Sequence, residues 1–245
     1  MALSPGDTFV SSVIAGGARY DRTVVCTPWL TAGVDVAELL RNTVVERLQP
    51  GDVIAITEKV VVVTTGRGIP ASMVRPGRLA TFAARHIRPI GDSRGLSIPE
   101  KMQLVIDMVG PWRVILAGAV AAATRPLGIR GPFFLVAGYI ARSMDGMRPP
   151  YGDMLLPPLP PRTARSIAGQ LATEIGHPVA IVDINDRGGS VRAVAGSAMS
   201  KRRLAAVLAD NPLGQRDQGT PIVVVHRVGS QEERRPLVTS GQRHH

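Results

Sequence analysis

HPVAIVDINDRGG, residues 177–189, is the stretch around which the rest of the chain is organised. An apolar run, Val179 to Val182, ends at Asp183 and is followed by Asn185, Arg187 and two glycines. In α/β proteins this pattern is typical of a buried strand whose carboxyl end brings polar groups into a ligand-binding crevice. Asp183 is therefore the first candidate for a binding residue. Asp, Asn and Gly are also common in ordinary turns, so the local pattern alone leaves a simple turn open.

Composition indicates a globular protein with one large or two small domains. The 245 residues are 44% hydrophobic, which is enough to build a core. The one cysteine, Cys26, excludes an intramolecular disulfide, and the first residues lack a signal-peptide pattern, so we expect a cytoplasmic protein. The longest apolar stretch, Val114 to Thr124, is shorter than the ~20 residues that cross a bilayer, so we expect no membrane partner.

The formal net charge is +10, and most of the basic residues are arginines. This balance suits anionic partners such as phosphate groups. The arginines are scattered along the chain and are not interleaved with aromatic residues, a pattern that does not favour a dedicated nucleic-acid surface. Nucleic-acid binding therefore ranks last among the functions considered.

Apolar periodicity and turn residues predict a series of helices and strands along the chain. Asp35 is the expected N-cap of the first helix. Helices are expected over residues 35–48, 76–88, 97–109, 163–175 and 201–209, and strands over 23–30, 52–57, 60–65, 133–141, 179–182, 191–194 and 221–228. The prolines between residues 147 and 162 mark a possible subdomain boundary within a domain spanning 22–228. Residues 1–21 are expected to form an N-terminal extension and residues 229–245 a disordered tail.

Several common mechanisms lack their motifs in this chain. The sequence has no phosphate-binding P-loop signature, no G-x-S-x-G nucleophile elbow, and no His or Cys spacing typical of a zinc site. The candidates that remain are side chains with oxygen atoms that can bind a metal ion, and loops that contain glycine.

Two aspartates follow apolar runs that we expect to be strands. Asp145 comes after FFLVAGYIA and Asp183 after VAIV, so the two carboxylates meet if the strands are neighbours. Such a pair is typical of Mg²⁺ or Mn²⁺ sites that handle phosphates. The loop LGQRDQGT, Leu213 to Thr220, adds Arg216 for phosphate and Gln215 as a possible ligand. Unrelated turn aspartates and an ordinary loop remain the alternatives at this point.

The ordered set of motifs is more specific than any one of them. TPWL, GDVIAITEKVVVVTTGRG, FFLVAGYIARSMDG, MLLPPLPP, VAIVDINDRGG and PLGQRDQGTPIVVV follow one another between about Arg22 and Val228. In this order they resemble the coenzyme F420-0 gamma-glutamyl ligase family, in which F420 denotes a deazaflavin cofactor. The chain is most similar to shorter relatives that end in an NPLGQ-x-D-x-x-TP segment.

The resemblance implies an α+β fold of mixed sheets and packed helices, assembled as an intertwined homodimer with two subdomains in each subunit. It also implies a ligase that uses Mg²⁺ or Mn²⁺ and GTP or ATP to join an amino acid to a small-molecule carboxylate. The implied metal ligands are Asp145, Asp183 and Gln215. The implied nucleotide contacts are Thr27, Pro28, Trp29, Leu30, Glu58, Lys59, Arg148, Leu213, Gly214, Arg216, Asp217, Gly219 and Thr220.

The chain also departs from the family pattern. Val63 stands where the family has a lysine that reaches the nucleotide phosphates, Thr65 where a glutamate occurs, and Ile184 where a threonine follows the second aspartate. The segment before NPLGQ is shorter than in the ligases, so the acceptor is expected to differ from the family's usual one. A non-catalytic relative that binds a nucleotide or deazaflavin-type ligand is the alternative to an active ligase.

Overall fold

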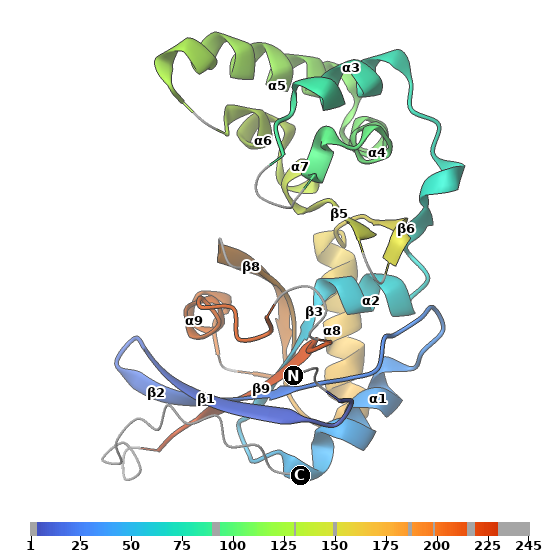
Figure 1. Cartoon of the computed structure of the whole chain (residues 1–245). Coiled ribbons are helices and arrows are strands. Elements are labelled where there is room, and N and C mark those ends of the chain that lie inside the picture. Colours follow the sequence, from blue (N-terminus) through green and yellow to red (C-terminus); the bar gives the residue numbers. More distant parts are fainter. Residues whose placement is uncertain are drawn as a thin grey trace. The chain divides into compact units, whose positions relative to one another are not determined.

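The protein is described from a computed structural model that covers residues 4–89, 94–129, 131–148, 151–185, 188–197, 199–214 and 219–229, and of Arg148 the backbone alone. The chain folds into two compact units (Figure 1). The sheet unit comprises residues 1–66 and 159–245, and the helical unit comprises residues 67–158. One of these boundaries falls within the expected segment 147–162, whereas no boundary was expected at the other position, Gly66. The expected disordered tail lies outside the described residues, except for Gly229.

The sheet unit is built on a six-stranded mixed sheet with the strand order β1-β2-β9-β3-β7-β8. β3 and β7 are parallel, and the other neighbouring pairs are antiparallel. The strands are β1 (Thr8–Ala15), β2 (Ala18–Val25), β3 (Val53–Thr57), β7 (Val179–Asn185), β8 (Gly188–Ala195) and β9 (Ile222–Arg227). The segment expected to extend from the domain, residues 1–21, thus contributes most of a β-hairpin to this sheet.

Helices cover the sheet because its central strands are apolar on both faces. Val53 to Ile56 of β3 are all fully buried. α8 (Pro161–Ile175) packs against β7, β8 and α1 (Val36–Thr43), whereas α9 (Lys201–Val207) packs against β8 and β1. The expected N-cap is confirmed, because the Asp35 carboxylate accepts hydrogen bonds from the Ala37 and Glu38 N–H groups. The first helix is shorter than expected, and a 3₁₀ turn, η1 (Val45–Arg47), follows it.

The strand expected over residues 60–65 is wrong. The chain instead forms the helix α2 (Glu58–Thr64) directly after β3. Val60, Val61, Val62 and Val63 are all buried in this helix. A run of β-branched residues favours a strand by propensity, but burial of the whole run within the fold outweighs a preference of less than about 1 kcal/mol per residue.

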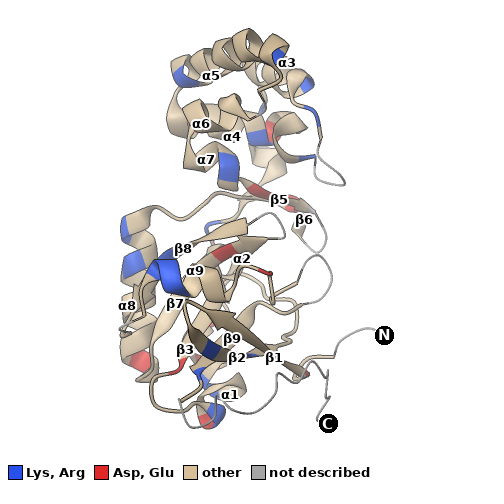
Figure 2. Cartoon of the chain, turned by 90° about the vertical axis from the view of Figure 1, so that its left-hand side faces the viewer, with Lys and Arg blue, Asp and Glu red and all other residues tan. Residues whose placement is uncertain are grey.

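The helical unit contains five α-helices among its described residues and a small sheet with the strand order β4-β6-β5. The helices are α3 (Arg78–His86), α4 (Pro99–Val109), α5 (Pro111–Thr124), α6 (Pro132–Ala137) and α7 (Tyr139–Ser143). The strands are β4 (Ile69–Pro70), β5 (Asp145–Arg148) and β6 (Tyr151–Leu156), and the 3₁₀ turns are η2 (Ala71–Met73), η3 (Gly95–Ser97) and η4 (Arg125–Leu127). Its core includes Met102, Val105, Phe133 and Leu155. Figure 2 shows Lys and Arg spread over helices of both units.

The strand expected at FFLVAGYIA is also wrong, because these residues form α6 and α7. Pro132 stands in the first turn of α6, and Gly138, with φ +89°, separates the two helices. Five apolar residues between a proline and a glycine fit a short buried helix as well as a strand, so periodicity could not distinguish the two. Asp145 consequently follows a helix and begins β5.

No single described helix is long and apolar enough to cross a membrane, although Pro99–Val109 and Pro111–Leu127, taken as a pair bent by 116°, meet the criteria of length and composition.

A buried arginine joins the first hairpin to the end of α9. Arg22, whose side chain is 4% exposed, forms a bidentate ion pair with Asp210 and donates hydrogen bonds to Ser11 Oγ and the Val207 carbonyl. The hydrogen bond from Arg22 lowers the pKa of Asp210. The carboxylate therefore contributes stability above the ordinary aspartate pKa, and this contribution is lost as the pH falls through the lowered pKa.

We expect Asp210→Asn to reduce the free energy of unfolding by about 1 kcal/mol at neutral pH, a modest cost because the Asp210 side chain is 58% exposed. Urea unfolding at pH 7 and in acid measures this effect. The deficit should shrink in acid as the wild-type carboxylate becomes protonated, and a deficit independent of pH would contradict the electrostatic explanation.

Candidate functional site at the carboxyl edge of the central strands

The ends of four strands come together at one edge of the six-stranded sheet. Val25 at the end of β2 pairs with Ile222 at the start of β9, and Ile222 also pairs with Ile56 of β3. Thr57, at the end of β3, pairs with Val182 of β7, the residue before Asp183. This edge of the sheet is therefore shared by four segments: those that follow β2 and β3, the one before β9, and the distal part of β7.

Two backbone hydrogen bonds fasten the loops at this edge. The Thr27 N–H donates to the Gly219 carbonyl at 2.8 Å, and the Thr57 N–H donates to the Pro221 carbonyl at 2.9 Å. Gly219 has φ +60°, and a Cβ there would lie 3.2 Å from the Thr27 oxygen. A glycine thus allows the close approach of the two predicted nucleotide loops.

The described part of the predicted glycine-rich loop is closed by its own polar groups. The Thr220 hydroxyl donates to the Leu213 carbonyl, and Asn211 Nδ2 donates to the Gly214 carbonyl at 3.2 Å. Leu213 and Thr220 are buried. Gln215, Arg216 and Asp217, the remaining predicted contacts of this loop, lie outside the described residues.

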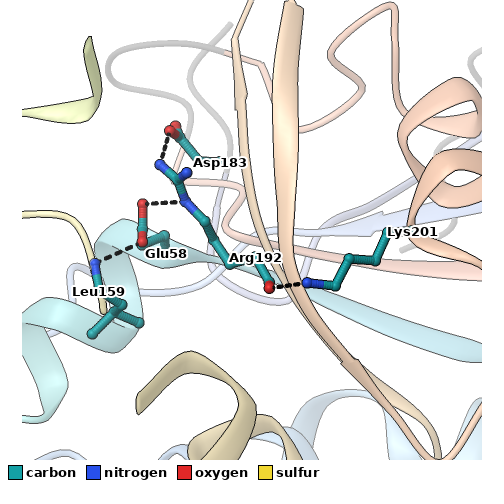
Figure 3. Close-up of polar contacts among 5 residues, drawn as sticks. All are labelled: Glu58, Leu159, Asp183, Arg192 and Lys201. Carbon is teal, nitrogen blue, oxygen red and sulfur yellow. Dashed lines mark hydrogen bonds and ion pairs between the residues drawn. The ribbon is translucent and has the colours of Figure 1, made fainter. Parts of the chain in front are cut away.

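A chain of ion pairs links the first residue of α2, directly after β3, with residues within β7 and β8 (Figure 3). Arg192 Nε lies 3.0 Å from Glu58 Oε2, and Arg192 Nη2 lies 2.7 Å from Asp183 Oδ2. The second Glu58 oxygen, Oε1, accepts a hydrogen bond from the Leu159 N–H at 2.8 Å. The Glu58 and Arg192 side chains are 7% and 13% exposed, whereas that of Asp183 is 34% exposed, so the chain of charges runs from the interior towards solvent.

A β-bulge places Arg192 between the two carboxylates. Ile181 of β7 pairs with Ala193, but Val182 pairs with Val191, so Arg192 is the extra residue in β8. Bulges redirect side chains and leave a backbone group without a ladder partner. The Arg192 carbonyl instead accepts a hydrogen bond from Lys201 Nζ, at the start of α9.

Burial shapes the electrostatics of this edge. Desolvation raises the pKa of Glu58, and the Asp183 charge adds to this effect, while Arg192 and the Leu159 N–H oppose it. Burial, together with the Asp7 charge, also raises the pKa of the Cys26 thiol. A raised pKa keeps Cys26 protonated, which argues against a nucleophilic role for this neighbour of Thr27.

The strand that carries Asp183 is longer than expected. β7 continues past Val182 to Asn185, and Asp183 pairs with Ser190 of β8. Asp183 therefore lies within a hairpin ladder rather than in the turn that follows a strand. Gly189 permits this hairpin, because a Cβ there would lie 2.4 Å from the Asp183 carbonyl oxygen.

The other predicted contacts in the sheet unit differ in exposure. Pro28, Trp29 and Lys59 are exposed, whereas Thr27 and Leu30 are buried. Val63, at the position where the resemblance implies a phosphate-contacting lysine, is 1% exposed in α2.

Asp145 and Arg148 lie in β5 of the helical unit, and Asp183 lies in the sheet unit. Their meeting at one site stays a prediction. Within the described residues, no group of three or more His, Cys, Asp or Glu side chains could hold a metal ion.

Arg192 was not expected to be a site residue. Its signal was an arginine between valine and alanine in a predicted strand that follows the Asp183 strand across two glycines. A charged residue within a strand usually has a cross-strand partner, but which residue that is depends on the register of the hairpin.

A comparison with known protein families identifies the same family that the ordered motifs resemble. The sequence model of the F420-0:Gamma-glutamyl ligase family matches residues 24–206, well over half of the chain. The match includes β3, β7 and the three charged residues of the ion-pair chain, and ends before the loop Leu213 to Thr220. A search of curated proteins found no match to the chain. The extent of the family match shows that this chain belongs to the F420-0:Gamma-glutamyl ligase family.

Proposed function

We propose that the protein is an amide-bond ligase that depends on a divalent metal and on GTP or ATP. The γ-phosphoryl group of the nucleotide transfers to an oxygen of a substrate carboxylate, which yields an acyl phosphate and a nucleoside diphosphate. The amino group of an amino acid then attacks the acyl carbon, so that an amide forms and inorganic phosphate leaves with the former carboxylate oxygen. The amine loses a proton in this step. The chain's task is to position the reactants and to balance their charges.

Family membership supports a ligase-like function, and one structural observation carries the proposed site. Within the sheet unit, the described residues that the resemblance assigns to the nucleotide lie around one edge of the sheet. At this edge the Thr27 N–H donates a hydrogen bond to the Gly219 carbonyl. The N–H of Thr57, the residue before Glu58, donates a hydrogen bond to the Pro221 carbonyl. Exposed Trp29 offers an apolar ring for a base. Exposed Lys59 offers a positive charge for phosphates.

The residues present fit a hard divalent cation in chemical type. Asp183 presents a partly exposed carboxylate at the same edge, and oxygen donors suit Mg²⁺ and Mn²⁺. We propose Asp183 as one ligand, with Asp145 and Gln215 as the others. A metal bound there would neutralise negative charge on the nucleotide phosphates.

A non-catalytic binding relative is the second candidate, and Val63 is the observation that favours it. A buried valine in α2 supplies no charge where the family's lysine reaches the phosphates. Such a protein would bind a nucleotide or a deazaflavin-type ligand without turnover.

Thermal unfolding tests nucleotide binding directly. We expect GTP or ATP to raise the melting temperature when Mn²⁺ or Mg²⁺ is present, because a ligand that binds the folded state stabilises it. If no nucleotide shifts the melting temperature with either metal, the ligase proposal fails. Metal-dependent phosphate release on addition of candidate carboxylates and amino acids then separates a ligase from a binding protein.

We also propose a homodimer, and the surface of the helical unit supports it. Most of the exposed large apolar side chains among the described residues lie there, including Trp112 at 80%, Leu135 at 71% and Leu116 at 57% exposure. Large exposed apolar patches are typical of interfaces between proteins.

We expect Leu116→Arg to shift the protein towards the monomer, since a charge at a buried subunit interface is costly. Light scattering after size-exclusion chromatography measures the mass. Val10→Arg, at an exposed apolar position of the sheet unit, is the matched control and should leave the mass unchanged. A wild-type protein that is monomeric at micromolar concentration would contradict the proposal.

A further inference from the structure

The net positive charge of the chain is concentrated in the helical unit. Residues 67–158 contain twelve Lys or Arg and five Asp or Glu, so this unit carries seven of the ten formal positive charges. Its first part is the most one-sided, because the sequence from Arg67 to Gly91 includes five arginines and no acidic residue. α3 lies in this stretch, and Figure 2 shows basic residues on it. A surface of this charge favours a polyanionic partner.

Four arginines in and around α3 are exposed and form no ion pair or hydrogen bond with a described residue through their side chains. They are Arg75, Arg78, Arg85 and Arg88. The helix packed against α3 is α4, where the Asp107 carboxylate accepts a hydrogen bond from Gln103 Nε2 at 2.7 Å. Guanidinium groups that the described part of the protein does not pair can bind an external anion through several N–H donors at once.

An aromatic ring lies between two of these arginines on the outer face of α3. Arg78, Phe82 and Arg85 follow the helical spacing i, i+4, i+7, which places the three side chains on one face. The two arginines are about 10 Å apart along the helix axis. Phe82 is 64% exposed, and the His86 ring lies beside it, with the two ring centroids 4.4 Å apart. The Phe82 ring is thus held at the surface between two positive charges.

This face of α3 does not suit a lipid bilayer. A helix that lies on a membrane inserts its apolar face, but the apolar face of α3 packs into the core of the helical unit. Ala80 and Ala84 are buried there, and Leu79, Ala83 and Ile87 pack against the same core. The side that α3 presents to solvent combines one aromatic ring with guanidinium groups. Proteins bind single-stranded nucleic acid with this combination, because basic groups neutralise the phosphates and aromatic rings stack on the bases.

We propose that the outer face of α3 binds single-stranded nucleic acid, with Phe82 stacked on a base and Arg78 and Arg85 bound to neighbouring phosphates. The arginines of the whole chain are scattered, and the helical spacing of α3 gathers these two around a ring. Binding of this kind tolerates many sequences, since every base has a face on which a ring can stack. This face is separate from the proposed ligase site, because none of its residues lies at the edge of the six-stranded sheet.

Fluorescence anisotropy of a labelled oligouridylate of about 12 nucleotides, titrated with the full chain, tests the role of the ring. We expect Phe82→Ala to weaken binding about tenfold, because the stacking of one base is lost. Phe82→Trp keeps an aromatic face and should retain the affinity. Heparin, a polyanion without bases, is the matched ligand, and its affinity should not change in Phe82→Ala.

The salt dependence of the same titration tests the arginines. Each phosphate contact on a single strand contributes about 0.7 to the slope of log affinity against log salt concentration. Arg78→Gln/Arg85→Gln should therefore weaken binding and reduce this slope by about 1.4. Arg162→Gln/Arg165→Gln is the matched control, because it removes two exposed arginines of α8 and changes the net charge equally. This control should leave the slope unchanged.

A wild-type protein that does not bind the oligonucleotide at low salt would overturn the proposal. Phe82→Ala with wild-type affinity, or an equal change of slope in the two double arginine variants, would overturn it as well. Vesicles of phosphatidylcholine and phosphatidylserine are titrated in parallel, and binding to vesicles without binding to the oligonucleotide would assign the face to a membrane instead. Circular dichroism melting verifies that each variant is folded, which is expected because the substituted side chains are exposed.

Discussion

Asp183→Asn is expected to abolish the metal-dependent stabilisation by nucleotide and to weaken Mn²⁺ binding by more than about 100-fold. Even the loss of a residue that only orients a ligand costs about 10- to 100-fold in metal affinity, so the loss of a ligand should cost more. The substitution keeps the shape of the side chain, and an amide oxygen can still accept the hydrogen bond from Arg192 Nη2. Thermal shift and titration calorimetry, each with and without metal, measure the two effects.

Asp153→Asn is the control for Asp183→Asn. Asp153 lies exposed in β6 of the helical unit and has no assigned role at the site. It should leave the nucleotide and metal responses unchanged. An Asp183→Asn variant that retains both responses at wild-type strength would show that Asp183 is not a ligand.

Gly146→Ala is expected to lower the stability of the helical unit by about 2–4 kcal/mol. Gly146 follows Asp145 in β5 and has φ +93°, a conformation that residues with a Cβ rarely adopt. A Cβ at this position would lie 2.1 Å from the Met154 carbonyl oxygen and 2.9 Å from the Leu156 nitrogen, both in the paired strand β6. Because these neighbours are backbone atoms, the two strands must separate to make room.

Urea unfolding followed by circular dichroism measures the loss, and hydrogen exchange over residues 67–158 localises it to the helical unit. Gly152→Ala is the matched control in the same sheet, because a Cβ there would meet no atom within 4 Å. We expect that variant to be as stable as the wild type or slightly more stable. Equal stability of the two variants would contradict the geometry described for β5.

The fold class and several element boundaries could be predicted from the sequence because local signals determined them. Asp35 caps α1 by the side-chain hydrogen bonds that its position suggested. Gly176 ends α8 with φ +73°, and apolar runs bounded by turn residues indicated the positions of β3, β7 and β9. Where a capping residue or a glycine with positive φ sets the end of an element, a few neighbouring residues carry the information.

The errors arose where tertiary packing decided between helix and strand. The valines of α2 and the apolar residues of α6 and α7 are short runs without a clear period, and such runs fit either structure. The first hairpin was missed because β1 lies at the edge of its sheet, and its partly buried residues show little apolar alternation. These elements depend on neighbours far away in the sequence.

In the candidate site, too, some residues could be predicted from the sequence and one depended on tertiary structure. Asp183 and Glu58 were singled out from the sequence, but the residue that joins them was not, because the bulge at Arg192 appears only when β7 and β8 are paired. The resemblance supplied Glu58 as a nucleotide contact, and the geometry adds that its carboxylate is bonded to Leu159 and Arg192. A pattern of residue types can suggest a carboxylate, but the identity of its counter-ion follows from the register of the strands.

Transfer of oxygen from the substrate carboxylate to phosphate tests the proposed ligase chemistry most directly. A panel of carboxylates that includes F420-0, labelled with ¹⁸O in the carboxyl group, is incubated with GTP or ATP, Mn²⁺ and amino acids, and the released phosphate is analysed by mass spectrometry. We expect one labelled oxygen to appear in inorganic phosphate for each amide formed, and Asp183→Asn to form neither product. Amide formation with unlabelled phosphate, or no nucleotide cleavage with any carboxylate in the panel, would contradict it.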